Sequence, residues 1–203
     1  MTKGKFIVIE GVEGAGKSHQ CKRLLEGLTA MGVDAILTRE PGGAALAEGI
    51  RKLLLDPEYS PDAVTELYLY SAARRDHLNK VIFPALDSGK VVVCDRFTFS
   101  TFAYQGYGRG LDIDFVNRVN AKTIAPLKID LGLFLDITPE DGFTRKGGAD
   151  KTDRLERESL DFFNRVYKGF KELCARGELV PIDASGEKTR TAENILREVR
   201  KIL

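Results

Sequence analysis

The chain has 203 residues, of which 43% are hydrophobic and 30% are charged, with 31 Lys and Arg against 30 Asp and Glu. This length suits one domain with a sizeable core, and the net charge of +1 gives no global electrostatic case for a nucleic-acid or membrane partner. The three cysteines are far apart and odd in number, so neither a disulfide framework nor a structural zinc site is expected. The apolar run before Glu10 is too short for a signal peptide or a membrane span, which predicts a cytoplasmic protein.

Short apolar runs alternate along the chain with longer segments of helical period. The runs predict strands near residues 6–9, 35–37, 91–94, 131–135 and 179–182. Apolar residues at steps of three and four predict helices near residues 21–31, 44–55, 62–86 and 192–203. Strands separated by helices are typical of an α/β fold, with a parallel sheet covered by helices on both faces. No repeat or linker divides the chain, so a single domain over residues 1–203 is predicted.

The segment from Arg145 to Arg154 departs from this packed pattern. It reads RKGGADKTDR and contains no large apolar residue. Two interpretations are open: a solvated surface loop, or a short mobile lid that carries charge onto a substrate.

A phosphate-binding motif follows the first predicted strand directly. The match to G-x-x-x-x-G-K-[ST] consists of Gly11, Val12, Glu13, Gly14, Ala15, Gly16, Lys17 and Ser18. Its glycines allow backbone N–H groups to turn toward phosphate oxygens, and the helix that begins here adds partial positive charge. Lys17 is expected to reach the β- and γ-phosphates of ATP, and the Ser18 hydroxyl is expected to ligate Mg²⁺.

Other classes of nucleotide-binding protein are disfavoured by the motifs that they would need. A GTPase would carry Asn-Lys-x-Asp, whereas Asn79-Lys80 is followed by Val81 and Ile82. The Leu-Ser-Gly-Gly-Gln signature of transport ATPases does not occur, and the chain is short for a motor ATPase. A small phosphotransferase is the class that remains.

Asp95 and Arg96 directly follow the third predicted strand. An acid at the carboxyl end of a parallel strand lies at the edge where such sheets bind ligands, so Asp95 is expected to hold the Mg²⁺ shell. Arg96 can clamp a phosphate through two parallel hydrogen bonds. Asp136 ends the fourth predicted strand and competes for the same acid role, but it lacks an adjacent arginine and ranks second.

The transfer of a phosphoryl group to a second phosphate requires fixed positive charge rather than a base. Arg39, Arg74 and Arg75 are further candidates to supply that charge. A phosphate acceptor has a second pKa near 6, so it is mostly deprotonated at neutral pH without a general base. His19 and His77 are therefore interpreted as surface or structural residues.

Taken together, the motifs resemble those of one family, the bacterial type of thymidylate kinase. The matching strings are Phe6–Ser18 (FIVIEGVEGAGKS), Thr38–Gly43 (TREPGG), Tyr70–Arg74 (YSAAR), Asp95–Arg96, Ser100–Gly106 (STFAYQG), Asp153–Glu156 (DRLE) and Asp183–Ser185 (DAS). They occur in the order typical of the family and span nearly the whole chain. The resemblance implies ATP-dependent phosphorylation of dTMP to dTDP on a P-loop fold with a five-stranded parallel sheet, usually in a homodimer.

The resemblance also implies roles for residues of the acceptor site. Glu13 would contact the sugar 3′-hydroxyl, and Arg39 and Arg96 would hold the acceptor phosphate. Tyr70 would stack on thymine, Arg74 would donate to its O4, and Thr101 and Gln105 would read the base edge. Tyr104 would crowd the sugar 2′ position, and residues 183–190 would lie near adenine.

One departure from the family pattern lies in the lid, residues 145–154. Where the phosphate loop lacks an arginine, as here, the family lid usually carries several, but this segment keeps only Arg145 and Arg154 with Lys151 between them. A lysine is a point charge and does not reproduce a guanidinium fork. The hypothesis is that Arg145 or Arg154 is the transition-state cation, with support from Lys151.

Two alternatives to dTMP kinase stay open at this stage. The first is a kinase of the same architecture with another nucleoside monophosphate as acceptor, which Thr101 and Gln105 would decide. The second is a nucleotide-binding protein with weakened catalysis, for which the arginine-poor lid is the argument.

Overall fold

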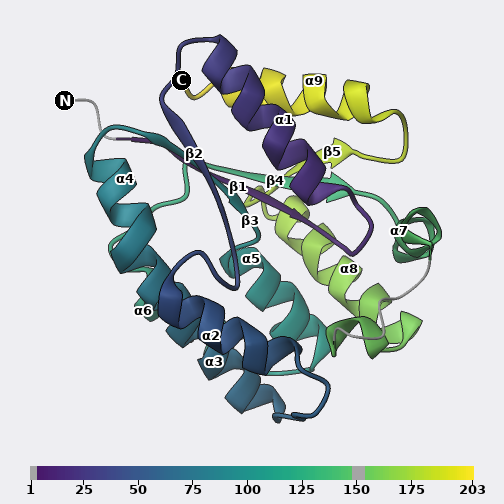
Figure 1. The fold of residues 1–203 in the computed structure, drawn as a ribbon. Helices are drawn as coiled ribbons and strands as arrows, with labels where there is room; N and C mark the ends of the chain where they lie inside the picture. The colour runs from purple at the N-terminus through teal and green to yellow at the C-terminus, as the bar shows by residue number, and fades with distance from the viewer. Residues whose placement is uncertain (1–3, 148–153) are drawn as a thin grey trace.

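The computed structural model describes residues 4–147 and 154–203, which form a layered α/β structure around one sheet (Figure 1). Five strands pair in parallel in the order β2-β3-β1-β4-β5. They are β1 (Phe6–Gly11), β2 (Ala35–Arg39), β3 (Val91–Asp95), β4 (Leu131–Asp136) and β5 (Val180–Asp183). All five predicted strands and the predicted fold class are therefore confirmed.

Helices cover both faces of the sheet. They are α1 (Lys17–Ala30), α2 (Ala45–Leu55), α3 (Ala63–His77), α4 (Phe83–Asp87), α5 (Thr98–Thr101), α6 (Ile113–Ile124), α7 (Pro139–Lys146), α8 (Leu160–Ala175) and α9 (Lys188–Arg200). Shorter turns of other pitch are η1 (Leu78–Ile82) and η2 (Phe102–Gly108), both π-helical, and the 3₁₀ turn η3 (Leu155–Arg157). In Figure 1, α1 and α9 lie on one side of the sheet, and α4, α5 and α8 lie on the other. Within the two described ranges, no helix is both long and apolar enough to cross a membrane.

The single long helix expected over residues 62–86 is instead three consecutive helical segments. These are α3, η1 and α4, and the wider π-helical turn between the two α-helices contains buried Leu78 and Ile82. Helices α6 and α8 were not predicted, although α8 buries Phe162, Val166 and Phe170 at steps of four.

The two faces of β1 carry the two halves of the core, because successive side chains of a strand point to opposite faces. Ile7 and Ile9 pack with Leu24 and Leu28 of α1. Phe6 and Val8 belong to the second cluster, which includes residues of η1 and α4. Burial on both faces explains why the strands read as continuous apolar runs rather than as alternating patterns.

The parallel sheet brings the carboxyl ends of its strands to one edge. Register places Arg39 of β2 opposite Asp95 of β3, and Asp95 opposite Ile9 of β1. Helix α1 leaves β1 toward one face, whereas α5 follows β3 toward the other (Figure 1). Ligands of such sheets bind in the crevice at this kind of switch point.

The first two residues of the predicted lid belong to α7. Thr138 caps the helix by accepting from Asp141 N–H, Pro139 occupies its first turn, and Gly147 ends it with a φ of +81°. Arg145 and Lys146 form its last turn, and Arg154 directly precedes η3. Residues 148–153, including Lys151, lie outside the described residues.

Candidate functional site

Two cavities meet at the phosphate loop. The first has a volume of about 310 Å³ and the second of about 620 Å³. Gly14, Lys17 and Ser18 line both of them. The first cavity is also lined by all eight residues predicted for the acceptor: Glu13, Arg39, Tyr70, Arg74, Arg96, Thr101, Tyr104 and Gln105. The second is lined by the rest of the loop from Gly14 onward and by residues of the segment 184–191.

The phosphate loop has the backbone that its glycines permit. Gly14 and Gly16 have φ angles of +74° and +87°, in the left-handed region that other residues avoid. A Cβ on Gly14 would lie 1.9 Å from the carbonyl oxygen of Gly142, so the loop packs directly on α7. The Lys17 ammonium donates to Val12 O at 2.8 Å, and burial together with the nearby charge of Arg96 lowers its pKa. The loop is thus a preformed cradle with a lysine at its centre.

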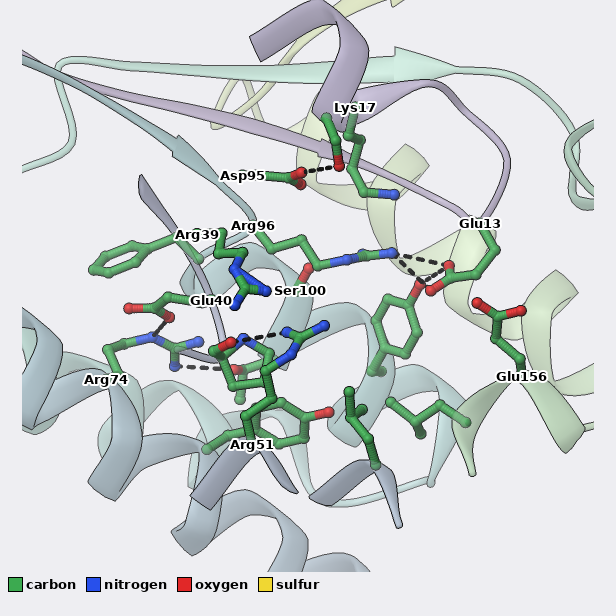
Figure 2. A pocket seen from close by; sticks show the side chains of 18 of the residues that line it. Glu13, Lys17, Arg39, Glu40, Arg51, Arg74, Asp95, Arg96, Ser100 and Glu156 are labelled. Carbon is green, nitrogen blue, oxygen red and sulfur yellow. Dashed lines mark hydrogen bonds and ion pairs between the residues drawn. The ribbon is translucent and has the colours of Figure 1, made fainter. Parts of the chain in front are cut away.

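Ser18 and Asp95 adjoin each other at the sheet edge. The Ser18 hydroxyl donates to Asp95 Oδ2 at 2.7 Å. Figure 2 shows Asp95 beside Lys17. Asp136 instead accepts from Tyr167 at 2.7 Å and from Lys171 at 2.7 Å. The structure therefore places Asp95, and not its competitor Asp136, at the phosphate loop.

This oxygen pair suits Mg²⁺ better than a metal that needs a protein cage. Mg²⁺ is commonly bound by one or two protein oxygens, with phosphates and water completing its shell. Among the described residues there is no cluster of three or more His, Cys, Asp or Glu that could hold a metal. Ser18 and Asp95 thus fit a metal that arrives with a nucleotide.

Arg96 lines the first cavity and reaches toward Glu13 (Figure 2). Its Nη2 donates to both carboxylate oxygens of Glu13 at 2.8 and 2.9 Å. Its Nη1 donates to Gly11 O at 3.0 Å and to Ser100 Oγ at 3.2 Å. Arg96 is also the one non-glycine among the described residues with a positive φ, +69°. Such strain persists where the surroundings over-determine a residue, and it clusters at functional sites.

Tyr104 completes the Arg96–Glu13 pair. Its hydroxyl donates to Glu13 Oε2 at 2.6 Å, and its ring centroid lies 5.1 Å from the guanidinium carbon of Arg96. Burial raises the pKa of Glu13, but the charges of Arg96 and Lys17 outweigh it, so the pKa is lowered overall. Burial and the Glu13 carboxylate raise the pKa of Tyr104 well above its usual value. The cluster of Arg96, Glu13 and Tyr104 therefore holds Glu13 as an ionised carboxylate beside the protonated hydroxyl of Tyr104.

Glu10 supports this cluster from below and was missed by the sequence analysis. It is fully buried and accepts from the backbone N–H groups of Phe97 and Ser100 at 2.8 and 3.0 Å. Its other oxygen accepts from Ser100 Oγ at 2.6 Å. Burial raises the pKa of Glu10 to about 7, although the Arg96 charge acts in the opposite direction. A charged residue directly after the apolar run 6–9 and before the phosphate loop was the available signal.

Arg74 is buried at the far end of the first cavity. Its Nε donates to Glu40 Oε2 at 2.6 Å, and its Nη1 donates to Thr101 Oγ1 at 3.0 Å (Figure 2). Glu40 also bonds His77 Nδ1 at 3.1 Å, and His77 Nε2 bonds Thr38 Oγ1 at 2.6 Å. His77 is therefore structural, as interpreted from the sequence, whereas the orienting role of Glu40 was not anticipated.

Gln105 lies on the same wall, four residues after Thr101. Its Nε2 donates to Glu66 Oε1 at 2.8 Å. Glu66 is fully buried and also accepts from Arg109 and Arg154. Tyr70 lines the cavity from α3 as well.

Two arginines add positive charge near the mouth of the first cavity. Arg39 donates to the carboxylate of Glu48 at 2.8 Å. Arg51 of α2 was not predicted, but it lines the cavity and donates to Pro41 O at 2.8 Å. Figure 2 shows Arg39 and Arg51 reaching the same space as Arg96. Arg51 follows buried Ala47 by four residues, about one helical turn, and this spacing was the sequence signal.

The two predicted lid arginines lie in different places. Arg145 lines the second cavity and donates to the carbonyls of Ala184 and Ser185. Arg154 instead donates to Glu66 at 2.5 Å and to Leu54 O at 2.9 Å. The structure thus brings Arg145 to the cavity beside the phosphate loop, whereas Arg154 is bound to Glu66 and lines neither cavity.

Gln20 of α1 was also missed and lines the second cavity. Its Nε2 donates to Lys188 O at 2.9 Å, so its Oε1 is left as an acceptor. Among the described residues, this Oε1 is the one buried side-chain oxygen or nitrogen without a hydrogen-bond partner. Gln20 and Lys188 line the second cavity but not the first.

Comparisons with known proteins agree with this architecture. The family model described as thymidylate kinase matches residues 9–195. A relative named thymidylate kinase from Psychrobacter sp. (strain PRwf-1) is 44% identical to this chain over the full length of both chains. A second, from Halothermothrix orenii, is 46% identical over 97% of this chain and 95% of its own length. Another from Pelotomaculum thermopropionicum is 45% identical over 99% of this chain and 95% of its own length. The chain belongs to the thymidylate kinase family.

Proposed function

We propose that this protein is an ATP- and Mg²⁺-dependent dTMP kinase that forms dTDP. The observation that carries the proposal is the meeting of two cavities at Gly14, Lys17 and Ser18. A donor in the second cavity and an acceptor in the first would have their phosphates at that junction. The family membership and the arginines of the first cavity support the same assignment.

The reaction is direct in-line phosphoryl transfer. An oxygen of the acceptor monophosphate attacks the γ-phosphorus of ATP, the bond to the β,γ-bridging oxygen breaks, and ADP leaves. Lys17 and the loop amides hold the β- and γ-phosphates, and Arg96 orients the acceptor phosphate together with Arg39. No base is required, because the acceptor phosphate is mostly deprotonated at neutral pH.

Ser18 and Asp95 are the residues proposed to hold Mg²⁺. When bound, the ion neutralises charge that develops on the phosphates. The 2.7 Å contact between the Ser18 hydroxyl and Asp95 supports this role, since it places two hard oxygen ligands together at the phosphate loop.

At the acceptor end, we assign the sugar to Glu13 and Tyr104 and the base to Tyr70, Arg74, Thr101 and Gln105. At the donor end, Arg145 is the better candidate for the transition-state cation, because it lines the second cavity. Arg154 is bound to buried Glu66, which supports an organising role near the acceptor. Closure of the lid, residues 145–154, would exclude water from the reacting phosphates.

An acceptor panel tests the proposed function. ADP release would be measured with Mg²⁺ and ATP in the separate presence of dTMP, dUMP, UMP, CMP, AMP and GMP. A strong preference for dTMP is expected. Preference for another acceptor would support the alternative nucleoside monophosphate kinase, and ATP binding without any acceptor-dependent release would support a protein with weakened catalysis.

A homodimer is the proposed assembly. Val64 and Tyr68 lie one helical turn apart on α3 and are 39% and 53% exposed, and the Tyr68 ring contacts Phe115 of α6. Sedimentation velocity should show a dimer that Tyr68→Asp weakens, whereas Met31→Asp on α1 should leave it intact. A monomer in the unsubstituted protein would refute this assembly.

A cytoplasmic location is proposed on chemical grounds. The proposed substrates are internal nucleotides, and Cys21, Cys94 and Cys174 are free thiols, which suits a reducing compartment. Fractionation that placed the protein outside the cytoplasm would contradict this location.

A further inference from the structure

We propose that Glu66 is a positioning residue that fixes the amide of Gln105 and thereby makes the acceptor site select a pyrimidine-2,4-dione over cytosine. The inference rests on the proposed function, because it concerns the base of that acceptor. It starts from an unusual group, a carboxylate on α3 with 0% exposure.

Two guanidinium groups surround the carboxylate of Glu66. Arg109 Nη2 donates to Glu66 Oε2 at 3.2 Å, and Arg154 Nη2 donates to the same oxygen at 2.5 Å. Buried carboxylates are stable when they are paired with cations and hydrogen-bonded, and two guanidinium groups meet that condition here. An ionised carboxylate accepts hydrogen bonds and donates none.

Because the Glu66 carboxylate can only accept hydrogen bonds, it determines how the Gln105 amide is oriented. The 2.8 Å contact with Glu66 Oε1 requires a donor, so the NH₂ group of Gln105 faces Glu66 and its carbonyl oxygen is directed elsewhere. Gln105 is 2% exposed and lines the first cavity, and its contact with Glu66 is the one side-chain hydrogen bond that it makes among the described residues. Glu66 therefore leaves Gln105 as a hydrogen-bond acceptor for a molecule in that cavity.

Arg74 supplies the complementary group beside it. Arg74 lines the same cavity and its Nη1 donates to Thr101, four residues before Gln105. A guanidinium is a donor only. Arg74 and Gln105 thus present a donor and an acceptor, which match the O4 and N3–H of thymine or uracil. Cytosine carries the opposite pattern, a 4-amino donor and an N3 acceptor, so both contacts would be mismatched.

Selectivity at the ring N3 position then depends on Glu66, although Glu66 is one residue removed from the base. With a glutamine at position 66, either end of that amide can face Gln105. The Gln105 amide would then be free to turn and to offer its NH₂ group to cytosine N3. The methyl group of thymine is not involved, so dTMP and dUMP should respond alike.

The test measures binding of dTMP, dUMP and dCMP by calorimetry, with dTMP-dependent ADP release recorded for the unsubstituted enzyme. Glu66→Gln should reduce the preference for dTMP over dCMP by about tenfold or more, with dUMP following dTMP. Glu158→Gln is the matched control, because Glu158 also binds Arg109, at 2.5 Å, but does not contact Gln105. It should leave the preference unchanged.

Gln105→Met provides a second variant, because it leaves both arginine pairs of Glu66 in place. It should lower the same preference, and Glu66→Gln added to it should lower the preference no further. An undiminished preference in Gln105→Met would overturn the proposal even if Glu66→Gln did not fold. The proposal would also be overturned if Glu66→Gln lowered the preference for dTMP over dCMP equally in the unsubstituted protein and in Gln105→Met. Absence of dTMP turnover in the unsubstituted enzyme would instead refute the proposed function.

Discussion

Glu10 makes the stability of the protein depend on pH in a direction opposite to that of most carboxylates. Burial raises its pKa from 4.5 to about 7 in the folded state. Between these values, the folded protein keeps a proton that the unfolded chain has released, so the free energy of unfolding falls as pH rises. The slope is about 1.4 kcal/mol per pH unit. Between pH 5.5 and pH 8.5 the contribution of Glu10 therefore falls by about 2 kcal/mol.

Glu10→Gln removes this titration while it preserves the contacts. The glutamine oxygen can accept from the N–H groups of Phe97 and Ser100, and its NH₂ can donate to Ser100 Oγ. Urea unfolding of both proteins from pH 5.5 to pH 8.5 would give the difference between their free energies of unfolding. The contributions of all other titrating groups cancel in this difference. From pH 5.5 to pH 8.5, the free energy of unfolding of the variant should rise by about 2 kcal/mol relative to that of the unsubstituted protein.

The matched control is Glu26→Gln, on the exposed face of α1. It should follow the pH dependence of the unsubstituted protein. If Glu10→Gln also followed that pH dependence, the account of Glu10 as a buried group that is protonated below about pH 7 would be wrong.

Three further predictions concern turnover. Lys17→Ala and Arg96→Ala should each lower kcat at saturating substrates by about 10² or more, because each removes a cation fixed at the reacting phosphates; a full-rate Arg96→Ala enzyme would refute the clamp. Tyr104→Phe should raise the use of UMP relative to dUMP, since the hydroxyl that donates to Glu13 is removed; an unchanged ratio would contradict its role at the sugar. Arg145→Ala should lower kcat more than Arg154→Ala does, and the reverse order would reassign the transition-state cation.

The phosphate loop and the strands could be predicted because their signals are local. Gly14 and Gly16 are needed for the positive φ angles of the loop, and Val91–Cys94 reads as a continuous apolar run because both faces of β3 are covered. Helix α8 carried the same kind of signal in Phe162, Val166 and Phe170, so it could have been found.

Glu66 could not be predicted in the same way. Glu66 meets Gln105 from 39 residues away and Arg154 from 88 residues away. No spacing or periodicity records such a pair, because it arises from the packing of α3 against η2 and the chain before η3. The direction of the Gln105 amide follows only from that partner. The separation of Arg145 from Arg154 likewise depends on the end of α7, which composition alone does not locate.

The most direct test of dTMP phosphorylation follows the phosphate itself. Purified protein would be mixed with ATP labelled in the γ-phosphate, Mg²⁺ and dTMP, with Lys17→Ala as the control, and the products would be separated. The account predicts that the label appears in the β-position of dTDP at a rate equal to ADP release, and that Lys17→Ala forms about a hundredth as much or less. Release of the label as inorganic phosphate, or its transfer to dCMP or UMP in preference to dTMP, would contradict it.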